Sequence, residues 1–418
     1  MAISFFILFL FVCYAFYRPN RAVLACFPVS LIFTTLPLVS FGQTNVGLNL
    51  VLYVIAIFIA TISHSGQSLN SCPYIKPLLF FIICFVAIFF LGAYRSSVYP
   101  LISKIATYSF PLFLWKKLRT KDDIHYILCV FVLVSVLIGG YTLIECFSGS
   151  NLWMEWLQSQ TSANIYVDHH DDIRFGFGRC NSFFHFPIPL GDYCAIIILF
   201  FLFWQLNSKQ FVFRNRVKFI VFVLLMFISL LLSNSRAPII ALLLGLFFVD
   251  IFKSKKTFAF LLLGGLLGCI FAGGYIFQNL QSITGGGNEN VGGSSMDMRQ
   301  VQLLYCLNEF YRNPFFGAGF NRLMELQDES NRDLMGAESQ AFFLLVEQGL
   351  LGIFAYIYGC VKMPTKFLLY GKKYFKFAVF FTFAWVAADM ISLTTGLFIT
   401  FPIILLLIVL RSIQLKIL

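Results

Sequence analysis

Long apolar runs separated by short polar stretches repeat along the whole chain. Many of the runs are long enough to cross roughly 30 Å of hydrocarbon as a helix, whereas strands of a membrane barrel would alternate over about ten residues. We therefore predict about thirteen helical membrane spans. They cover residues 2–17, 22–41, 48–63, 77–93, 98–115, 124–145, 188–206, 217–233, 237–252, 257–277, 341–360, 376–392 and 395–411.

The polar connections predict the orientation of the spans. Basic residues collect in four connections, which we expect to be cytoplasmic because cytoplasmic loops of membrane proteins carry an excess of Lys and Arg. This register leaves two long polar segments, 146–187 and 278–340, on the outer side of the membrane. Thirteen spans place the N-terminus outside, and twelve spans with both ends inside are an equal alternative. The four basic connections are 116–123, 207–218, 253–256 and 362–373.

Composition agrees with this class of protein. With 59% hydrophobic residues and a mean hydropathy of +0.83, the chain is too apolar for a soluble protein of any usual class. The net charge of +11 lies in the short loops, so we read it as topological rather than as a nucleic-acid surface. The fold class predicted for residues 1–418 is an all-α polytopic membrane protein, a single domain in which functional residues belong to the two long segments.

Cysteine usage indicates no metal or haem site. The eleven cysteines are scattered, and no C-x-x-C pair occurs. Cys146 and Cys180 flank the first long segment. In an oxidising compartment they form a disulfide, or else they remain two unpaired thiols.

The first long segment contains charged residues next to a membrane span. Asp168 to Asp172 form an Asp/His cluster, but its spacing matches no known metal site, so a solvated loop is the simpler reading and no metal is predicted. Arg174, Arg179 and His185 stand among Phe and Gly at the entrance to the next span. Because a charge at that depth is costly without a partner, each arginine needs an anion. It either snorkels to lipid head groups, pairs with Asp171 or Asp172, or binds a substrate phosphate.

A second group of candidates lies further along the chain. Arg236 follows Ser233, Asn234 and Ser235 in a short hairpin, where it could cap carbonyls or bind a phosphate through its fork. Arg299 stands in the first turn of a predicted amphipathic helix.

Glu338 opens the helix that re-enters the membrane. It is either a partner of the helix dipole or a carboxylate placed to accept a proton from an attacking hydroxyl. The Gly317-x-Gly319 pair follows no strand and is not followed by Gly-Lys, so no nucleotide-binding motif applies.

Several motifs stand in one order along residues 170–355. They are Arg with His-Phe-Pro before a span, "SNSRAPIIALLLG", Arg299 opening an amphipathic helix, "RNPFFGAGF" and "ESQAFFLLVEQGLLG". In this order and spacing the chain resembles the superfamily of O-antigen ligases and Wzy-type O-antigen polymerases.

The resemblance implies a mostly helical membrane glycosyltransferase of GT-C-like architecture without a cofactor. Its donor and acceptor would be undecaprenyl-diphosphate-linked glycans on the periplasmic side of the bacterial inner membrane, in lipopolysaccharide biosynthesis. A polysaccharide chain-length regulator is a further expected partner, besides membrane lipid. Transfer would invert the anomeric centre, with Arg174, Arg179, Arg236 and Arg299 on the diphosphate, Glu338 as base and His185 as a weaker candidate.

The residue types at positions 338 and 339 distinguish the two activities of the superfamily. Ligases usually carry His-Asn here, so Glu-Ser favours a polymerase over a ligase that transfers polymer to lipid A-core. A lipid-linked oligosaccharide transporter is the alternative from another class. Transporters often show two related halves, which this chain does not, and its candidate charges gather on one face.

Overall fold

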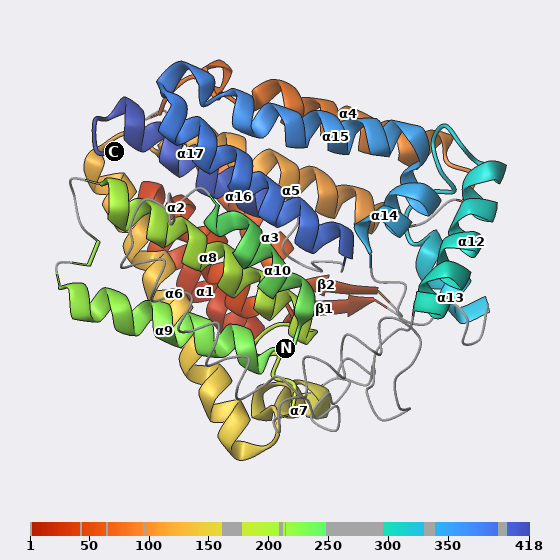
Figure 1. Ribbon diagram of the computed structural model, residues 1–418, viewed down its shortest axis with the longest axis horizontal. Coiled ribbons are helices and arrows are strands. Elements are labelled where there is room, and N and C mark those ends of the chain that lie inside the picture. Colours follow the sequence, from red (N-terminus) through yellow and green to blue (C-terminus); the bar gives the residue numbers. More distant parts are fainter. Residues whose placement is uncertain are drawn as a thin grey trace.

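The computed structural model of the protein is a bundle of helices with one small hairpin (Figure 1). Among the described residues, the helices long and apolar enough to cross a membrane are α6 (Lys121–Ser148), α8 (Pro187–Asn207), α16 (Lys372–Ile391) and the stretch Gln340–Tyr370. The protein is therefore an all-α polytopic membrane protein, as predicted. The structure describes residues 2–41, 44–63, 66–94, 97–160, 178–208, 212–213, 215–247, 296–329, 339–391 and 399–418.

Most of the other predicted spans also correspond to helices. The predicted span 257–277 lies outside the described residues, and so does the end of span 237–252. These helices are α1 (Ala2–Tyr17), α2 (Pro19–Ser30), α3 (Leu48–Ile62), α4 (Ile75–Leu91), α5 (Val98–Lys117), α9 (Arg216–Leu232), α10 (Arg236–Leu246), α14 (Gln340–Phe343), α15 (Gly349–Thr365) and α17 (Thr400–Gln414).

The prediction of one span over residues 22–41 is wrong. Helix α2 ends at Ser30, a 3₁₀ turn covers Leu31–Phe33, and an antiparallel hairpin follows, β1 (Pro37–Phe41) and β2 (Thr44–Gly47). A proline disfavours helical geometry at the residue before it, so the helix could not continue through Leu36 and Pro37. The apolar run there is a buried helix followed by a strand, which hydropathy alone does not separate.

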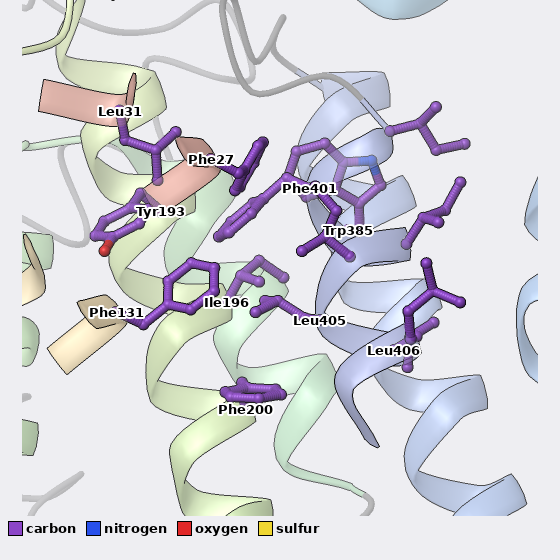
Figure 2. Packing of buried hydrophobic residues seen from close by; sticks show 14 of the residues in the cluster. Phe27, Leu31, Phe131, Tyr193, Ile196, Phe200, Trp385, Phe401, Leu405 and Leu406 are labelled. Carbon is purple, nitrogen blue, oxygen red and sulfur yellow. The ribbon is translucent and has the colours of Figure 1, made fainter. Parts of the chain in front are cut away.

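Helices α8 and α17 form the centre of the bundle. In the most apolar window of α8, 89% of the residues are buried, as expected for a helix that is hydrophobic on all sides. Figure 2 shows aromatic rings packed between these helices and their neighbours, and the rings of Phe27, Tyr193 and Trp385 all lie within about 6 Å of the ring of Phe401. This rigid core carries the ends of the helices at which the candidate residues lie.

Short helices occupy the described parts of the two long polar segments. Helix α7 (Leu152–Gln160) lies in the first, and α12 (Met296–Arg312) and α13 (Arg322–Glu329) lie in the second. The carboxylate of Glu309 lies 3.5 Å from the guanidinium of Arg312 and 3.7 Å from that of Arg322, so it ties α12 to α13. Figure 1 shows these two helices side by side at one end of the bundle.

Candidate functional site

A buried carboxylate at the end of α6 holds the segment 178–186, which contains Arg179 and His185. Glu145 accepts hydrogen bonds from the backbone N–H of Asn181 at 3.0 Å and of Ser182 at 2.7 Å. The side-chain amide of Asn151 donates to Glu145 at 3.1 Å, to the side-chain oxygen of Asn181 at 2.8 Å and to the carbonyl of Ser182 at 2.8 Å. We call Glu145, Asn151, Asn181 and Ser182 the Glu145 network. Because all four residues are buried, the network sets the path of the segment.

The Glu145 network also determines where His185 lies. The side-chain amide of Asn181 donates to the carbonyl oxygens of Phe184 at 2.9 Å and His185 at 3.4 Å, just before α8 begins at Pro187. The imidazole is half-buried, and this burial lowers the pKa of His185 below its usual value. At neutral pH the ring is therefore uncharged and able to accept a proton.

Arg179 reaches the turn between α9 and α10. Its guanidinium donates to the carbonyl of Ser233 at 3.5 Å and to the hydroxyl of Ser235 at 3.4 Å. The next residue, Cys180, donates its backbone N–H to the carbonyl of Leu232 at 3.0 Å. Since Arg236 opens α10 directly after Ser235, two of the predicted arginines belong to one site.

The N-terminal part of α8 packs against Ser233, in the turn between α9 and α10, and against Pro238 in the first turn of α10. A side chain at Gly191 would place its Cβ 2.7 Å from Pro238 Cγ and 2.8 Å from Ser233 Oγ, so only glycine allows this approach. Asp192 follows. It is fully buried, and in the described part of the chain neither of its carboxylate oxygens has a hydrogen-bond partner. An ionisable residue inside a membrane span is by default a functional candidate, and sequence reasoning missed this one.

Helix α16 brings a second buried acid to the site. Asp389 accepts a hydrogen bond from the hydroxyl of Tyr356 at 2.7 Å and interacts electrostatically with Asp192. Asp192 lies on α8 and Asp389 on α16, and both of these helices pack against α10, the helix that Arg236 opens. Both acids interrupt long apolar runs in the sequence, which was the available signal for them.

Ser339 attaches the start of α14 to α16. Its hydroxyl donates to the carbonyl of Met390 at 2.5 Å and accepts from the N–H of Ala341 at 3.2 Å, so it is the N-cap of the helix. The helix therefore begins at Gln340, and the expectation that Glu338 itself opens it is off by two residues. Glu338 lies outside the described residues, immediately before the cap.

For other predicted site residues, either the whole residue or its side chain lies outside the described part of the chain. Arg174 and the cluster Asp168 to Asp172 lie outside the described residues. Arg299 is in the first turn of α12, while its side chain is not among those described. Of the predicted site residues, the described side chains are thus Arg179, His185 and Arg236.

The glycine pair Gly317 and Gly319 belongs to a backbone lock between two distant segments. The N–H groups of Ala318 and Gly319 donate to the carbonyls of Val346 at 2.7 Å and Glu347 at 3.2 Å, where a π-helical turn (Leu344–Gln348) frees these carbonyls. In return, the N–H groups of Leu350 and Leu351 donate to the carbonyls of Pro314 and Phe315 at 2.8 and 3.0 Å. We call these paired stretches, 313–319 and 346–351, the glycine lock.

Glycine is required at two positions of the lock. Gly317 has φ +70° and Gly349 has φ +61°, both in the region that favours glycine. A Cβ on Gly317 would lie 2.4 Å from the backbone of Gln348, and one on Gly349 would lie 2.5 Å from the backbone nitrogen of Gly317. The two motifs "NPFFGAGF" and "VEQGLLG" are therefore halves of one structural unit.

Glu347 supports the lock rather than an open site. Its carboxylate lies near the backbone of Asn321 and Leu323 and interacts electrostatically with half-buried Lys104, while its Oε1 has no hydrogen-bond partner in the described part of the chain. The ammonium of Lys104 also lies 5.2 Å from the ring centre of Phe320. The glutamate of this motif thus holds the start of α13 against α5.

The fold and the site together define a multi-pass membrane protein with arginines and buried carboxylates gathered at one end of its bundle. Residues 221–357 match the family model described as O-antigen ligase. The match contains the arginine turn of α10, helix α12 and both halves of the glycine lock, and it confirms the resemblance to the O-antigen ligase and polymerase superfamily. The family implies a glycosyltransferase-like role in O-antigen processing. No curated protein matches the chain.

Proposed function

We propose that the protein is an O-antigen polymerase. It joins undecaprenyl-diphosphate-linked oligosaccharide repeat units into polysaccharide on the periplasmic face of the bacterial inner membrane. The observation that carries this proposal is the contact of Arg179 with Ser233 and Ser235, next to Arg236. Two residues expected on the diphosphate, from distant parts of the sequence, meet at one turn of the chain.

The arginines supply what the reaction requires. As the bond between the sugar C1 and the diphosphate oxygen breaks, negative charge grows on the leaving diphosphate. Fixed guanidinium groups at low dielectric stabilise that charge more strongly than the ground state. Arg174, Arg179, Arg236 and Arg299 form this clamp, and their positive charge takes the place of a divalent metal ion.

Glu338 accepts the proton of the acceptor hydroxyl. The bond between Ser339 and Met390 supports this role, because it fixes the helix start that directly follows Glu338. Attack in line with the leaving diphosphate inverts the anomeric centre. His185, which is uncharged at neutral pH, is the second candidate for the same role.

The two long segments form the periplasmic part of the enzyme. Residues 146–187 and 278–340 bind the glycan chains of donor and acceptor, within a single membrane domain covering residues 1–418. A chain-length regulator contacts the same face. Flat aromatic rings of these segments could stack on sugars, but Trp153 of α7 contributes little, because its ring packs on Trp156 at 5.4 Å and on Phe183 at 5.6 Å.

Transfer of finished polymer to lipid A-core is the second candidate function, because the matching family model is described as O-antigen ligase. Glu338 and Ser339 favour polymerisation, since ligases usually carry His-Asn at these positions. The distinction therefore rests on two residues and is decided by the product.

A gel of surface lipopolysaccharide from a strain lacking the gene tests the proposal. Core bearing a single repeat unit is the expected result, because ligation continues when extension fails. Bare core, with long polymer accumulating on undecaprenyl-diphosphate, would instead establish the ligase. An unchanged ladder would overturn both functions in O-antigen assembly.

A further inference from the structure

Two cysteines meet beside the segment that carries Arg179. Cys146 lies near the end of α6 and Cys180 lies in the segment 178–186, and the two thiols are close enough to interact electrostatically. The backbones on either side are held together independently of the thiols. Glu145, next to Cys146, binds the N–H groups of Asn181 and Ser182, which follow Cys180.

The position of this pair in the fold differs from that of the other cysteines on apolar helices. Cys84, Cys194 and Cys360 lie along the lengths of α4, α8 and α15, surrounded by hydrocarbon or packed helices. Cys146 and Cys180 instead lie where the chain leaves α6 and approaches α8. Under the proposed function this end faces the periplasm, an oxidising compartment in which disulfides form and persist.

We propose that Cys146 and Cys180 form a disulfide in the mature protein, which fastens the segment bearing Arg179 to the end of α6. The inference rests on the periplasmic orientation of the proposed function. It assigns a covalent modification to two thiols that the transfer reaction itself does not use.

The bond forms by thiol–disulfide exchange with a protein disulfide of the periplasm. Cys146 is half-buried whereas Cys180 is buried, so Cys146 reaches the donor first. Its thiolate attacks one sulfur of the donor and releases the other as a thiolate. The Cys180 thiolate then attacks the mixed disulfide at Cys146 and releases the second donor sulfur. The donor leaves as a dithiol, having taken both electrons and, by way of solvent, the two protons of the cysteines.

The disulfide constrains the chain around the arginine. It closes a loop over residues 147–179, which includes Arg174 and ends at Arg179. Closing a loop of this length removes conformational freedom from the unfolded state. It also keeps Arg179 at the turn that contains Ser233. The disulfide thus acts as a positioning element and takes no part in bond transfer.

Counting free thiols tests the inference on the full-length protein. Protein from cell membranes is denatured under acid quench and treated with maleimide-polyethylene glycol, with and without prior reduction. Two fewer additions without reduction are expected. Cys146→Ser and Cys180→Ser should each abolish this difference, while Cys129→Ser, an exposed position elsewhere on α6, should keep it.

Equal numbers of additions to the wild-type protein, with or without reductant, would overturn the inference. Mass spectrometry of the unreduced wild-type protein gives an answer that needs no variant. A peptide pair joined through Cys146 and Cys180 is expected, and finding both peptides only as free thiols would contradict the proposal.

Polymer length, measured beside thermal stability, tests whether the disulfide also positions Arg179. Loss of the bond in Cys146→Ser should lower the thermal midpoint of the purified protein and shorten the surface polymer, and the double variant should equal the single ones. The thiol count does not depend on polymerisation. If deleting the gene leaves the ladder unchanged while the wild-type protein contains the oxidised pair, the polymerase proposal fails and the disulfide stands. If the deletion abolishes chain extension while both thiols of the wild-type protein are free, only the disulfide proposal fails.

Discussion

The Glu145 network and the glycine lock solve the same problem with different chemistry. Each joins stretches that are distant in the sequence at an end of the bundle. In the network, one carboxylate and one side-chain amide satisfy buried backbone groups. In the lock, backbone bonds to backbone directly, because glycine lets the two stretches approach. A side-chain network tolerates changes of spacing but not of hydrogen-bonding groups, whereas a backbone lock tolerates most side chains but no added Cβ at its glycines.

This contrast assigns different tasks to the two regions. The network presents Arg179 and His185, which belong to the proposed chemistry. At the lock, Glu347 is buried and interacts electrostatically with Lys104. We therefore expect substitutions in the lock to act on folding and substitutions around the network to act on transfer.

Gly349→Ala should have the largest effect. Strain at φ +61° and the contact of the new Cβ with backbone together should cost roughly 3–5 kcal/mol, enough to remove most folded protein from the membrane. An immunoblot of membranes with detergent-extracted thermal unfolding measures this. Gly140→Ala is the matched control, because nothing lies within 4 Å of its Cβ, and it should change stability by less than about 1 kcal/mol. Equal stability of the two variants would contradict the lock.

Arg236→Ala should reduce the rate of chain extension by a factor on the order of 10²–10³ while the protein stays inserted. The reason is the loss of a fixed positive charge beside the developing diphosphate, and Arg299→Ala should act in the same way. Polymer length on a lipopolysaccharide gel and turnover of lipid-linked repeat units measure the effect. Arg312→Ala serves as control because that side chain is 74% exposed. Polymer of wild-type length in both Arg236→Ala and Arg299→Ala would contradict the proposal that these arginines bind the diphosphate.

Glu338→Gln should slow transfer by a factor on the order of 10² and leave donor binding intact. The amide keeps the size of the side chain but cannot take the proton of the acceptor hydroxyl. Single-turnover kinetics with a lipid-linked donor separate binding from transfer. Glu155→Gln on α7, an exposed carboxylate, is the comparison variant. If Glu338→Gln transferred at the wild-type rate, Glu338 would be confined to the helix dipole.

Glu145→Gln should cost about 2 kcal/mol of folding free energy and reduce extension as well. Its new NH₂ group faces either the N–H of Asn181 or that of Ser182, so one buried donor loses its acceptor. Chemical denaturation of the purified protein reports the stability, and the polymer gel reports the displacement of Arg179. Stability lost without any change in polymer would show that the network does not position the arginine.

His185 should produce the smallest effect, visible only as pH dependence. Burial lowers its pKa in the folded protein below the unfolded value of about 6.5. Between the two values the unfolded chain binds more protons, so the stabilisation is complete above the unfolded pKa and is lost as pH falls through the folded pKa. Thermal midpoints measured from pH 7.5 down to 5 should decline less in His185→Asn. A decline identical to that of the wild-type protein would mean that the ring is solvated.

Much of the fold was predictable because a membrane span is a property of a contiguous run. The helices around residues 124–145, 188–206 and 376–392 appear near the predicted positions. The span predicted over 22–41 failed because an apolar strand and an apolar helix have the same hydropathy, and Pro37 separates them only through backbone geometry.

The candidate site was predictable only in part. Arg179, His185 and Arg236 were identifiable as charges beside apolar runs, where an unpaired charge is costly. Their grouping was not, because no periodic pattern links residue 179 to residue 236. Asp192 and Asp389 carried a signal in the sequence, since each interrupts a long apolar run, while Asn151 and Glu145 carried none.

The sequence by itself determined that this chain crosses a membrane many times as helices, which residue types are available at the helix ends, and which superfamily it resembles. These are local properties of composition, run length and motif order. The tertiary structure alone decided that Arg179 contacts the turn before Arg236 and that Glu145 holds the segment 178–186. It also decided that Gly317 and Gly349 belong to one glycine lock. Such contacts depend on the relative placement of whole helices, and that placement arises from the packing of many side chains together.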